Sequence, residues 1–340
     1  MVAPTDTFDD VLPEALRVTS PAPLVDIGAN LTHESFARDL PAVLARARAA
    51  NVTTLILTGT DREHAEQAVA LAREHAGLFA TAGVHPHDAS QWDPALEHAM
   101  RELHGQSEVV AVGECGLDFN RNFSTPAEQE RAFEAQLGLA AESGKPLFLH
   151  ERDAGRRMRE MLHTWRDDIS DAVIHCFTAD RETLYGYRDL DLHIGLTGWL
   201  CDERRGHHLR ELVGEIPMDR LMVETDCPYL LPRNLPAKLK GRRHEPALLP
   251  WIVKEIAHWR GMDEAALARA TTATALAFFR LPTGETRPAT EHEEFSHGRP
   301  REHGNPRLHR RRDGRGWRAA AGYRLDAARW AGQAHPDPAG

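Results

Sequence analysis

Six residues that can bind a metal ion or transfer a proton stand at or near the ends of short apolar runs. They are Asp26, His85, Glu114, His150, His175 and Asp226. Each one alone has an ordinary structural explanation, because a histidine that ends a strand usually bonds the backbone and a carboxylate there often caps a helix. Together, imidazoles and carboxylates form the ligand set of Zn²⁺, Mn²⁺ or Mg²⁺, and the carboxylates favour the harder ions. The six positions therefore predict a divalent-metal site.

A metal site without a covalent nucleophile predicts hydrolysis by water. No serine or cysteine of the chain lies in a nucleophile elbow of the Gly-x-Ser-x-Gly kind. Divalent ions acidify bound water and polarise a carbonyl or phosphoryl oxygen. Asp226, the last of the six residues, is the candidate that accepts the proton of the attacking water or orients it. These residues indicate a metal-assisted hydrolase.

Eight apolar runs must bring the six residues together. Helical stretches rich in Ala, Glu and Arg separate the runs, which cover residues 24–31, 53–60, 78–86, 109–118, 146–152, 172–177, 191–198 and 221–230. Continuous apolarity is typical of strands buried on both faces of a parallel sheet. The alternation predicts an α/β fold, the (β/α)₈ or TIM barrel, whose C-terminal strand ends converge on one face. An open doubly wound sheet is the alternative, but no glycine-rich phosphate fingerprint follows the first run.

Two helix starts can also be located in the sequence. Thr60 with Glu63, and Thr125 with Glu128, have the spacing of a capping box, in which two side chains bond free N–H groups of the first turn. Pro126 would occupy the first helical position of the second box, where proline is well tolerated. We therefore expect helices to begin after Thr60 and after Thr125.

The chain of 340 residues divides into three parts. Residues 1–22 lack a clear pattern and are interpreted as an N-terminal extension. Residues 24–281 have the length of one barrel domain. Residues 285–340 are rich in Gly, Pro, His and Arg and have no sustained apolar period, which predicts a disordered tail.

Charge and hydropathy narrow the class of protein. The net charge of −10 argues against broad non-specific clamping of nucleic acid, although it permits a nucleic-acid substrate at a small metal site. No run approaches the roughly 18 unbroken apolar residues of a membrane span. The N-terminus has no basic head followed by an apolar stretch. We therefore expect a cytoplasmic location and no membrane partner.

The four cysteines contain no Cys-x-x-Cys pair, which argues against a disulfide framework or a zinc knuckle. Cys115, Cys176 and Cys227 each directly follow one of the six candidate residues. Side chains alternate between the two faces of a strand, so these cysteines should point away from the site. We expect them to serve in packing.

Seven sequence blocks within residues 24–281 resemble the TatD-type deoxyribonuclease family of the metal-dependent hydrolase superfamily. They are DIGANLTHESFARD, TAGVHPHDASQW, VVAVGECGLDFNRNFSTPAEQERAFEAQL, HERDA, IHCFT, GLTGWLCDERRG and VETDCPYLLPRNL. The resemblance implies a TIM-barrel, Mg²⁺-dependent 3′→5′ exonuclease that prefers single-stranded DNA and RNA. It also implies a cytoplasmic monomer with a role in DNA repair or turnover, and Mn²⁺ and Zn²⁺ remain alternative ions.

The same resemblance assigns roles to individual residues. Glu114, His150 and His175 correspond to metal ligands of the family. Asp226 corresponds to the residue that faces the attacking water and a second ion. The resemblance therefore implies a catalytic Asp226 that is also a metal ligand.

One block departs from the pattern of the superfamily. Most members carry Asp-x-His-x-His on the first strand, whereas this chain has Asp26, Gly28 and Asn30 at those positions. A second ion would then depend on oxygen ligands from Glu114, Asp226, Asp26 and Asn30, a shell that suits Mg²⁺ better than Zn²⁺. Replacing Gly28 and Asn30 by histidine is expected to tighten that second site.

Four residues are candidates for substrate contact. His85 lies in the GVHPHD block and could contact phosphate, although a loop histidine that bonds the backbone explains it equally well. Arg204 and Arg205 follow the seventh run and could hold phosphate, with a loop ion pair as the alternative. Asn30 is the fourth candidate.

Other functions are compatible with the same barrel. A D-aminoacyl-tRNA deacylase or another ester hydrolase would use the same metal set. A non-catalytic binding protein is the alternative outside enzymes. The joint presence of Glu114, His150, His175 and Asp226 argues against loss of catalysis.

Overall fold

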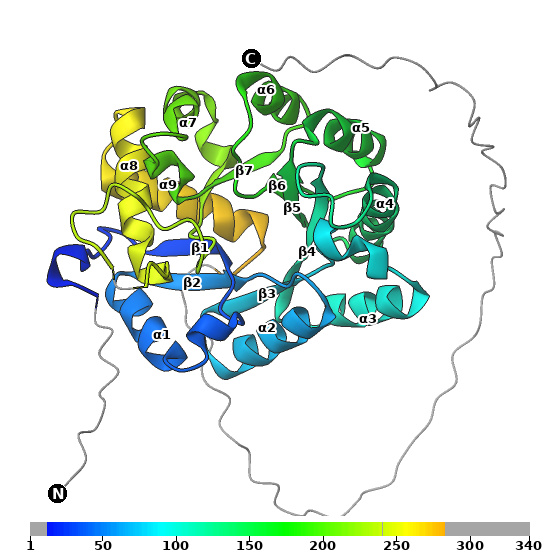
Figure 1. Ribbon diagram of the computed structural model, residues 1–340, viewed down its shortest axis with the longest axis horizontal. Helices are drawn as coiled ribbons and strands as arrows, with labels where there is room; N and C mark the ends of the chain where they lie inside the picture. The colour runs from blue at the N-terminus through cyan, green and yellow to red at the C-terminus, as the bar shows by residue number, and fades with distance from the viewer. Residues whose placement is uncertain (1–11, 240, 283–340) are drawn as a thin grey trace, which may run out of the picture. The chain divides into compact units, whose positions relative to one another are not determined.

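The computed structural model describes residues 12–239 and 241–282, which form an eight-stranded parallel barrel surrounded by helices (Figure 1). The strands are β1 (Leu24–Ala29), β2 (Val52–Leu57), β3 (Leu78–Ala82), β4 (Val109–Asp118), β5 (Leu147–Arg152), β6 (Ala172–Ile174), β7 (His193–Leu196) and β8 (Leu221–Val223). Their order in the sheet is their order in the chain. This confirms the predicted (β/α)₈ barrel and excludes the doubly wound alternative, whose strand order reverses.

The helices lie outside the strands (Figure 1). They are α1 (Leu40–Ala49), α2 (Arg62–Glu74), α3 (Pro94–His104), α4 (Pro126–Ser143), α5 (Gly155–Trp165), α6 (Arg181–Asp189), α7 (His207–Leu212), α8 (Leu249–Arg260) and α9 (Glu264–Phe278). Short 3₁₀ helices occur in the connections: Glu14–Leu16, Glu34–Phe36, Pro86–Gln91, Gly198–Cys201, Val213–Glu215, Met218–Arg220 and Pro246–Leu248. Within the described residues, no helix has both the length and the apolarity needed to cross a membrane.

The capping boxes differ in outcome. At α4, the Thr125 side chain accepts the N–H of Glu128 and the Glu128 side chain accepts the N–H of Thr125, which confirms the prediction. The predicted box at Thr60 is wrong, because Asp61 is the N-cap of α2 and its carboxylate accepts the N–H of His64 at 2.9 Å. A carboxylate caps a helix at least as well as a hydroxyl, so the helix begins one residue later.

Two apolar cores hold the barrel together. The larger lies between the strands and the surrounding helices, and the smaller fills the barrel interior. In the smaller core, Phe278, Phe279 and Leu281 from the end of α9 pack against Val25 of β1 and Val110 of β4. Burial on both faces explains why the strands have continuous apolar sequences.

The barrel closes at a seam between β1 and the segment that follows β8. Ala29 and Cys227 form a parallel bridge. The N–H of Asn30 donates to Cys227 O at 2.9 Å, and the N–H of Asp226 donates to Gly28 O at 2.8 Å. These few bonds replace the longer ladders that join the other neighbouring strands.

Two bidentate ion pairs brace this seam from the side. Arg46 of α1 donates to Glu245 at 2.6 and 2.7 Å. Arg243 donates to Asp39, the residue before α1, at 2.8 and 2.7 Å. Forked guanidinium–carboxylate pairs of this kind fix orientation as well as distance. They tie the β8–α8 loop to the start of the barrel.

The described part begins with a segment that packs on the barrel. Leu12 and Leu16 are buried, and Trp251 Nε1 donates to Leu16 O at 3.1 Å. The first 11 residues of the predicted extension, and the whole of the predicted tail at 285–340, lie outside the described residues. The three-part division of the chain stays a prediction.

Candidate metal centre

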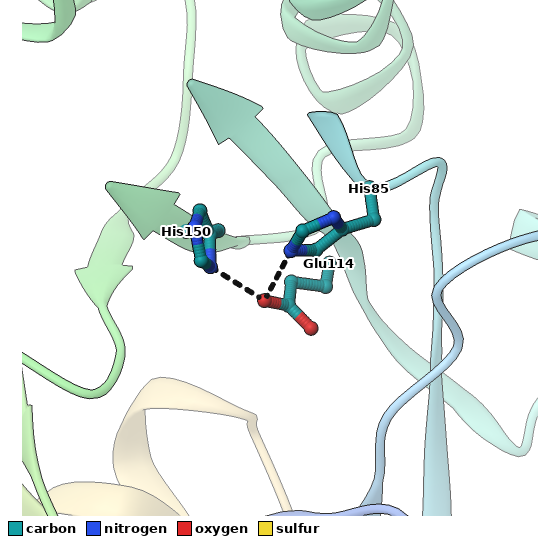
Figure 2. Close-up of side chains that lie close together, drawn as sticks. All are labelled: His85, Glu114 and His150. Carbon is teal, nitrogen blue, oxygen red and sulfur yellow. Dashed lines mark hydrogen bonds and ion pairs between the residues drawn. The ribbon is translucent and has the colours of Figure 1, made fainter. Parts of the chain in front are cut away.

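Glu114 is the centre of a polar cluster at the C-terminal ends of the strands. Its Oε1 atom lies 2.8 Å from His175 Nε2 and 3.0 Å from His150 Nδ1. His85 Nε2 lies 3.4 Å from the same oxygen. Figure 2 shows His85 and His150 directed at this one oxygen from two sides. Glu114 and His150 belong to β4 and β5, whereas His85 follows β3 and His175 directly follows β6.

A close approach of β4 to the loop after β3 positions Glu114. The N–H of Glu114 donates to Gly59 O at 2.8 Å. A Cβ on Gly83 would collide with the backbone of Gly113, so glycine is required where the two segments meet. The pairing of β4 with β5 also shifts register between Gly113 and Cys115. Glu114 is the residue between these two, so it lies at the register shift itself.

The structure brings the predicted ligands together in a different combination. The ligand atoms of His85, Glu114 and His150 all lie within 4.8 Å of one another. The rings of His150 and His175 are 5.9 Å apart, and His175 joins the cluster through Glu114. His85, for which phosphate contact and a structural role were both open above, thus lies close enough to Glu114 and His150 to share an ion with them.

Burial and neighbouring charges act in opposite directions on this cluster. Burial would raise the pKa of Glu114, but the charges of His175 and His85 hold that pKa well below its usual value. Burial would lower the pKa of His175, but Glu114 and Glu224 raise it well above its usual value. Glu114 therefore stays ionised at neutral pH, as a ligand of a cation must be.

Asp118 is a site residue that sequence reasoning missed. It ends β4 and its side chain is 1% exposed. Its Oδ2 lies 2.9 Å from His87 Nε2 and 3.3 Å from His150 Nε2. Burial opposes ionisation, but the contacts with His150, the Arg121 N–H and His87 lower the pKa of Asp118. Asp118 is the last residue of the apolar run 109–118, which also contains Glu114. That position is the sequence signal that could have marked it as a candidate.

Glu224 is the second missed residue, and it is fully buried. Its Oε2 lies 3.4 Å from His175 Nδ1, and its Oε1 accepts the N–H of Cys176 at 2.5 Å. A partner on Nδ1 fixes the ring orientation and aims Nε2 at Glu114. The signal was present in the VETDCP block, where Glu224 precedes Asp226 by two residues.

Glu224 also explains the glycine that replaces a histidine on the first strand. A Cβ on Gly28 would collide with Glu224 Oε2. A histidine at Gly28 would have to displace the Glu224 carboxylate, so the expectation that it would build a second metal site stays a prediction. Asp26 is also engaged: its Oδ2 accepts the Thr225 hydroxyl at 2.6 Å.

Asp226 and Asn30 lie together at the seam. Asn30 Nδ2 donates to Asp226 Oδ1 at 3.0 Å and to Cys227 O at 3.1 Å. Burial raises the pKa of Asp226 to about 7, against the opposing effect of His175. Asn30 therefore holds one oxygen of this carboxylate and leaves the other available to a proton or a cation.

Arg204 and Arg205 lie in the loop after β7 and pair with one carboxylate. Arg205 Nε donates to Asp202 Oδ2 at 3.0 Å, and its guanidinium lies 4.2 Å above the ring of Trp199. Arg204 Nε lies 3.9 Å from Asp202 Oδ1. This is the loop ion pair that was the alternative to phosphate contact. The phosphate contact stays a prediction.

The donor set fits a divalent cation. One ionised carboxylate oxygen lies among three imidazoles, and a second carboxylate, Asp118, contacts His87 and His150 from the other side. Imidazole nitrogen with carboxylate oxygen is the ligand chemistry of Mn²⁺, Zn²⁺ and, with more oxygen, Mg²⁺. Four of these side chains are buried, namely His85, Glu114, Asp118 and His175, and buried charges require partners.

Comparison with known proteins identifies the family of the chain. The family model of TatD related DNase matches residues 25–280. The chain belongs to this family. The 3′-5′ ssDNA/RNA exonucleases TatD of Shigella flexneri serotype 5b and of Escherichia coli K12 are each 54% identical over 258 residues, covering 76% of this chain and 99% of the relative. The resemblance noted in the sequence blocks is thereby confirmed.

Solved structures share the TatD fold at lower identity. A TatD homologue from Escherichia coli K12 aligns with a TM-score of 0.70 at 24% identity, covering 76% of this chain and 98% of its own. A TatD-family hydrolase from Entamoeba histolytica aligns with a TM-score of 0.68 at 22% identity, covering 77% and 98%. At this identity the likeness is one of fold.

Proposed function

We propose that this TatD-family protein is a metal-dependent 3′→5′ exonuclease that hydrolyses single-stranded DNA and RNA. The observation that carries the proposal is the Glu114 carboxylate among three histidines at the C-terminal strand ends of a barrel. The names of relatives that are 54% identical over nearly their whole length supply the substrate class. Active sites of such barrels lie at this end of the strands.

The roles of the residues follow from their contacts. Glu114, His150 and His175 would hold the ion, with His85 as a further nitrogen donor. When bound, the ion supplies Lewis-acid polarisation of the phosphate and a more acidic attacking water. Asp226 would accept the proton of that water, and the bond from Asn30 to its Oδ1 supports this role because it leaves Oδ2 free.

We propose Mg²⁺ as the native ion, since Glu114, Asp118 and Asp226 offer hard carboxylate oxygens. The three imidazoles near Glu114 make Mn²⁺ and Zn²⁺ the ions to test beside it. A cytoplasmic location fits the four free cysteines, because reducing compartments keep thiols unpaired. We also propose that the protein is a monomer. Its role would lie in DNA repair or turnover.

A time course on end-labelled oligonucleotides tests this function. Single-stranded DNA labelled at the 3′ or the 5′ end is incubated with Mg²⁺, Mn²⁺, Zn²⁺ or EDTA. A ladder that shortens from the 3′ end, and stops in EDTA, is expected. His150→Ala should abolish it, whereas the matched control His98→Ala, a 70% exposed side chain on α3, should not.

Two outcomes would contradict the proposal. Undiminished cleavage in EDTA would refute metal dependence. Cleavage of a D-aminoacyl-tRNA ester with none of DNA or RNA would favour the ester-hydrolase alternative.

A further inference from the structure

Two aromatic rings stand exposed on the face that carries the metal cluster. Phe123 is 68% exposed and Tyr229 is 53% exposed, the two largest values among the exposed large apolar side chains of the described part. Phe123 lies between β4 and α4, and Tyr229 follows β8. Both loops leave the C-terminal ends of their strands. Because β4 and β8 are four strands apart in an eight-stranded barrel, the two loops lie on opposite sides of its mouth.

Phe123 is connected to the metal cluster through a series of rings. Its centroid lies 4.7 Å from that of His87, with the planes perpendicular. His87 in turn lies 4.2 Å from His85, whose Nε2 is 3.4 Å from Glu114. The exposed ring is therefore the outermost member of a series of edge-to-face ring contacts that begins at the cluster.

The backbone beside Phe123 is anchored although the ring is exposed. Its neighbour Ser124 is 1% exposed. The Ser124 hydroxyl donates to His87 O at 2.8 Å and accepts the N–H of Ser90 at 3.0 Å. Gln129 Nε2 donates to Ser124 O at 2.9 Å. The loop therefore presents the Phe123 ring from a fixed position.

Tyr229 is presented in the same way on the other side. Its N–H donates to Asp226 O at 3.0 Å. Its carbonyl accepts from Nδ1 of His244, a fully buried side chain, at 2.8 Å. The neighbouring Arg243 is held by Asp39 through two hydrogen bonds. Tyr229 thus stands three residues from Asp226 on an anchored segment.

We propose that Phe123 and Tyr229 each stack one nucleobase of an unpaired strand, on either side of the phosphate at the Glu114 cluster. This proposal deepens and rests on the nuclease function proposed above. Anchored rings lose little conformational freedom on binding, and every base offers a face for stacking. Bases of a paired end stay stacked and bonded within the duplex, so they cannot reach two rings on opposite sides. The rings therefore select single-stranded ends.

Binding and kinetics of matched variants test the stacking. Phe123→Ala and Tyr229→Ala are compared with Tyr185→Ala, a 44% exposed aromatic on α6 outside the site. Anisotropy of a labelled single-stranded decamer in EDTA measures binding without cleavage. Each of the first two variants should bind about tenfold more weakly and show a KM raised about tenfold, with kcat changed less. Tyr229→Phe keeps the ring and should restore the binding that Tyr229→Ala loses.

Abasic substrates identify the contact. An abasic sugar is placed at one of the last two positions of the 3′ end. The loss caused by Phe123→Ala should vanish with the abasic site at one position, and the loss caused by Tyr229→Ala with the abasic site at the other. The preference for single-stranded over blunt double-stranded ends should fall in the double variant.

Equal affinities and KM values in all variants would overturn the proposal, as would equal losses on intact and abasic strands. A wild-type protein that binds the decamer but never cleaves it with any metal would refute the nuclease function instead. The binding comparison would still decide the role of the rings in that case. Melting temperatures equal to that of the wild type show that the variants are folded.

Discussion

The two ends of the barrel interior differ in chemistry although the same eight strands build both. At the N-terminal strand ends, Phe278, Phe279 and Leu281 close the interior with apolar contacts. At the C-terminal ends, Glu114 and Glu224 are buried as acids beside histidines. Apolar burial stabilises the fold, whereas buried charges cost free energy unless they are paired. The N-terminal strand ends therefore stabilise the fold, whereas the C-terminal strand ends hold the acids and histidines of the cluster.

Replacing Glu114, the acid at the centre of the cluster, should cause the largest loss of activity. Glu114→Gln keeps the size of the side chain and removes the charge among His85, His150 and His175. An interaction worth several kcal/mol corresponds to a fall in kcat/KM of about 10³-fold or more. Single-turnover cleavage of labelled DNA measures the fall, and calorimetry measures the lost metal affinity. Retention of more than a tenth of the activity would remove Glu114 from the centre.

Truncation of an apolar side chain at the N-terminal strand ends should lower stability and leave activity nearly unchanged. Phe278 is 5% exposed and packs inside the barrel base, with His193 at 4.8 Å between ring centroids. Phe278→Ala should lower the free energy of unfolding by about 3–5 kcal/mol, through lost burial and the cavity that remains. Urea denaturation measures this loss. Activity per folded molecule should stay within twofold, and a larger loss of activity would show that the two ends are coupled.

His104 is a buried histidine outside the metal cluster, so its replacement should change stability and leave activity unchanged. His104 Nε2 bonds Ala82 O at 2.8 Å, and burial lowers the pKa of His104 to about 4. The unfolded chain takes up a proton below pH 6.5 and the folded chain does not, so stability present above pH 6.5 is lost as pH falls toward 4. Between pH 7 and pH 5, the free energy of unfolding should fall by about 2 kcal/mol less in His104→Gln than in the wild type.

Urea titrations at the two pH values measure this difference. An identical loss in both proteins would contradict the neutral state of folded His104. Activity at pH 7 should be the same in both, unlike the effect expected at His150 or His175.

The last prediction concerns Glu224, the acid in contact with His175 Nδ1. Glu224→Gln leaves a hydrogen-bond partner for the Cys176 N–H but removes the charge beside His175 Nδ1. Partners that orient a ligand histidine contribute about 10–100-fold to metal affinity or activity. Metal titration by calorimetry should show weaker binding at unchanged stoichiometry. Unchanged affinity together with a lower melting temperature would reduce Glu224 to a packing role.

The barrel and most of its strand ends could be predicted from sequence. Continuous apolar runs fix the strands, and parallel topology brings Glu114, His150 and His175 to one face without any knowledge of packing. The sequence could have marked Asp118 and Glu224 as strand-end acids, but it could not show which histidine each of them contacts. Their partners, His87 and His175, lie 31 and 49 residues away in the chain.

Two of the three cysteines pack as predicted: Cys115 lies within β4, and Cys227 forms the isolated bridge with Ala29. Cys115 and Cys227 are buried in the outer core, as expected. Cys176 is partly exposed and has φ 46°, beyond the end of β6, so alternation no longer sets its direction. The register shift beside Glu114 in the pairing of β4 with β5 is likewise a feature that no local sequence pattern reveals.

The seam has a consequence for how the chain folds. Every other pair of neighbouring strands is adjacent in sequence, but the Asn30–Cys227 bonds and the Arg46–Glu245 pair join residues 197 and 199 positions apart. Closing so long a loop costs more entropy than closing a hairpin-sized one, and the contacts form only after the intervening strands have ordered. The seam should close last in refolding and open first in native-state hydrogen exchange. Asn30 and Asp226 lie on it, so with the role proposed for Asp226 activity should appear only in the slowest step of folding.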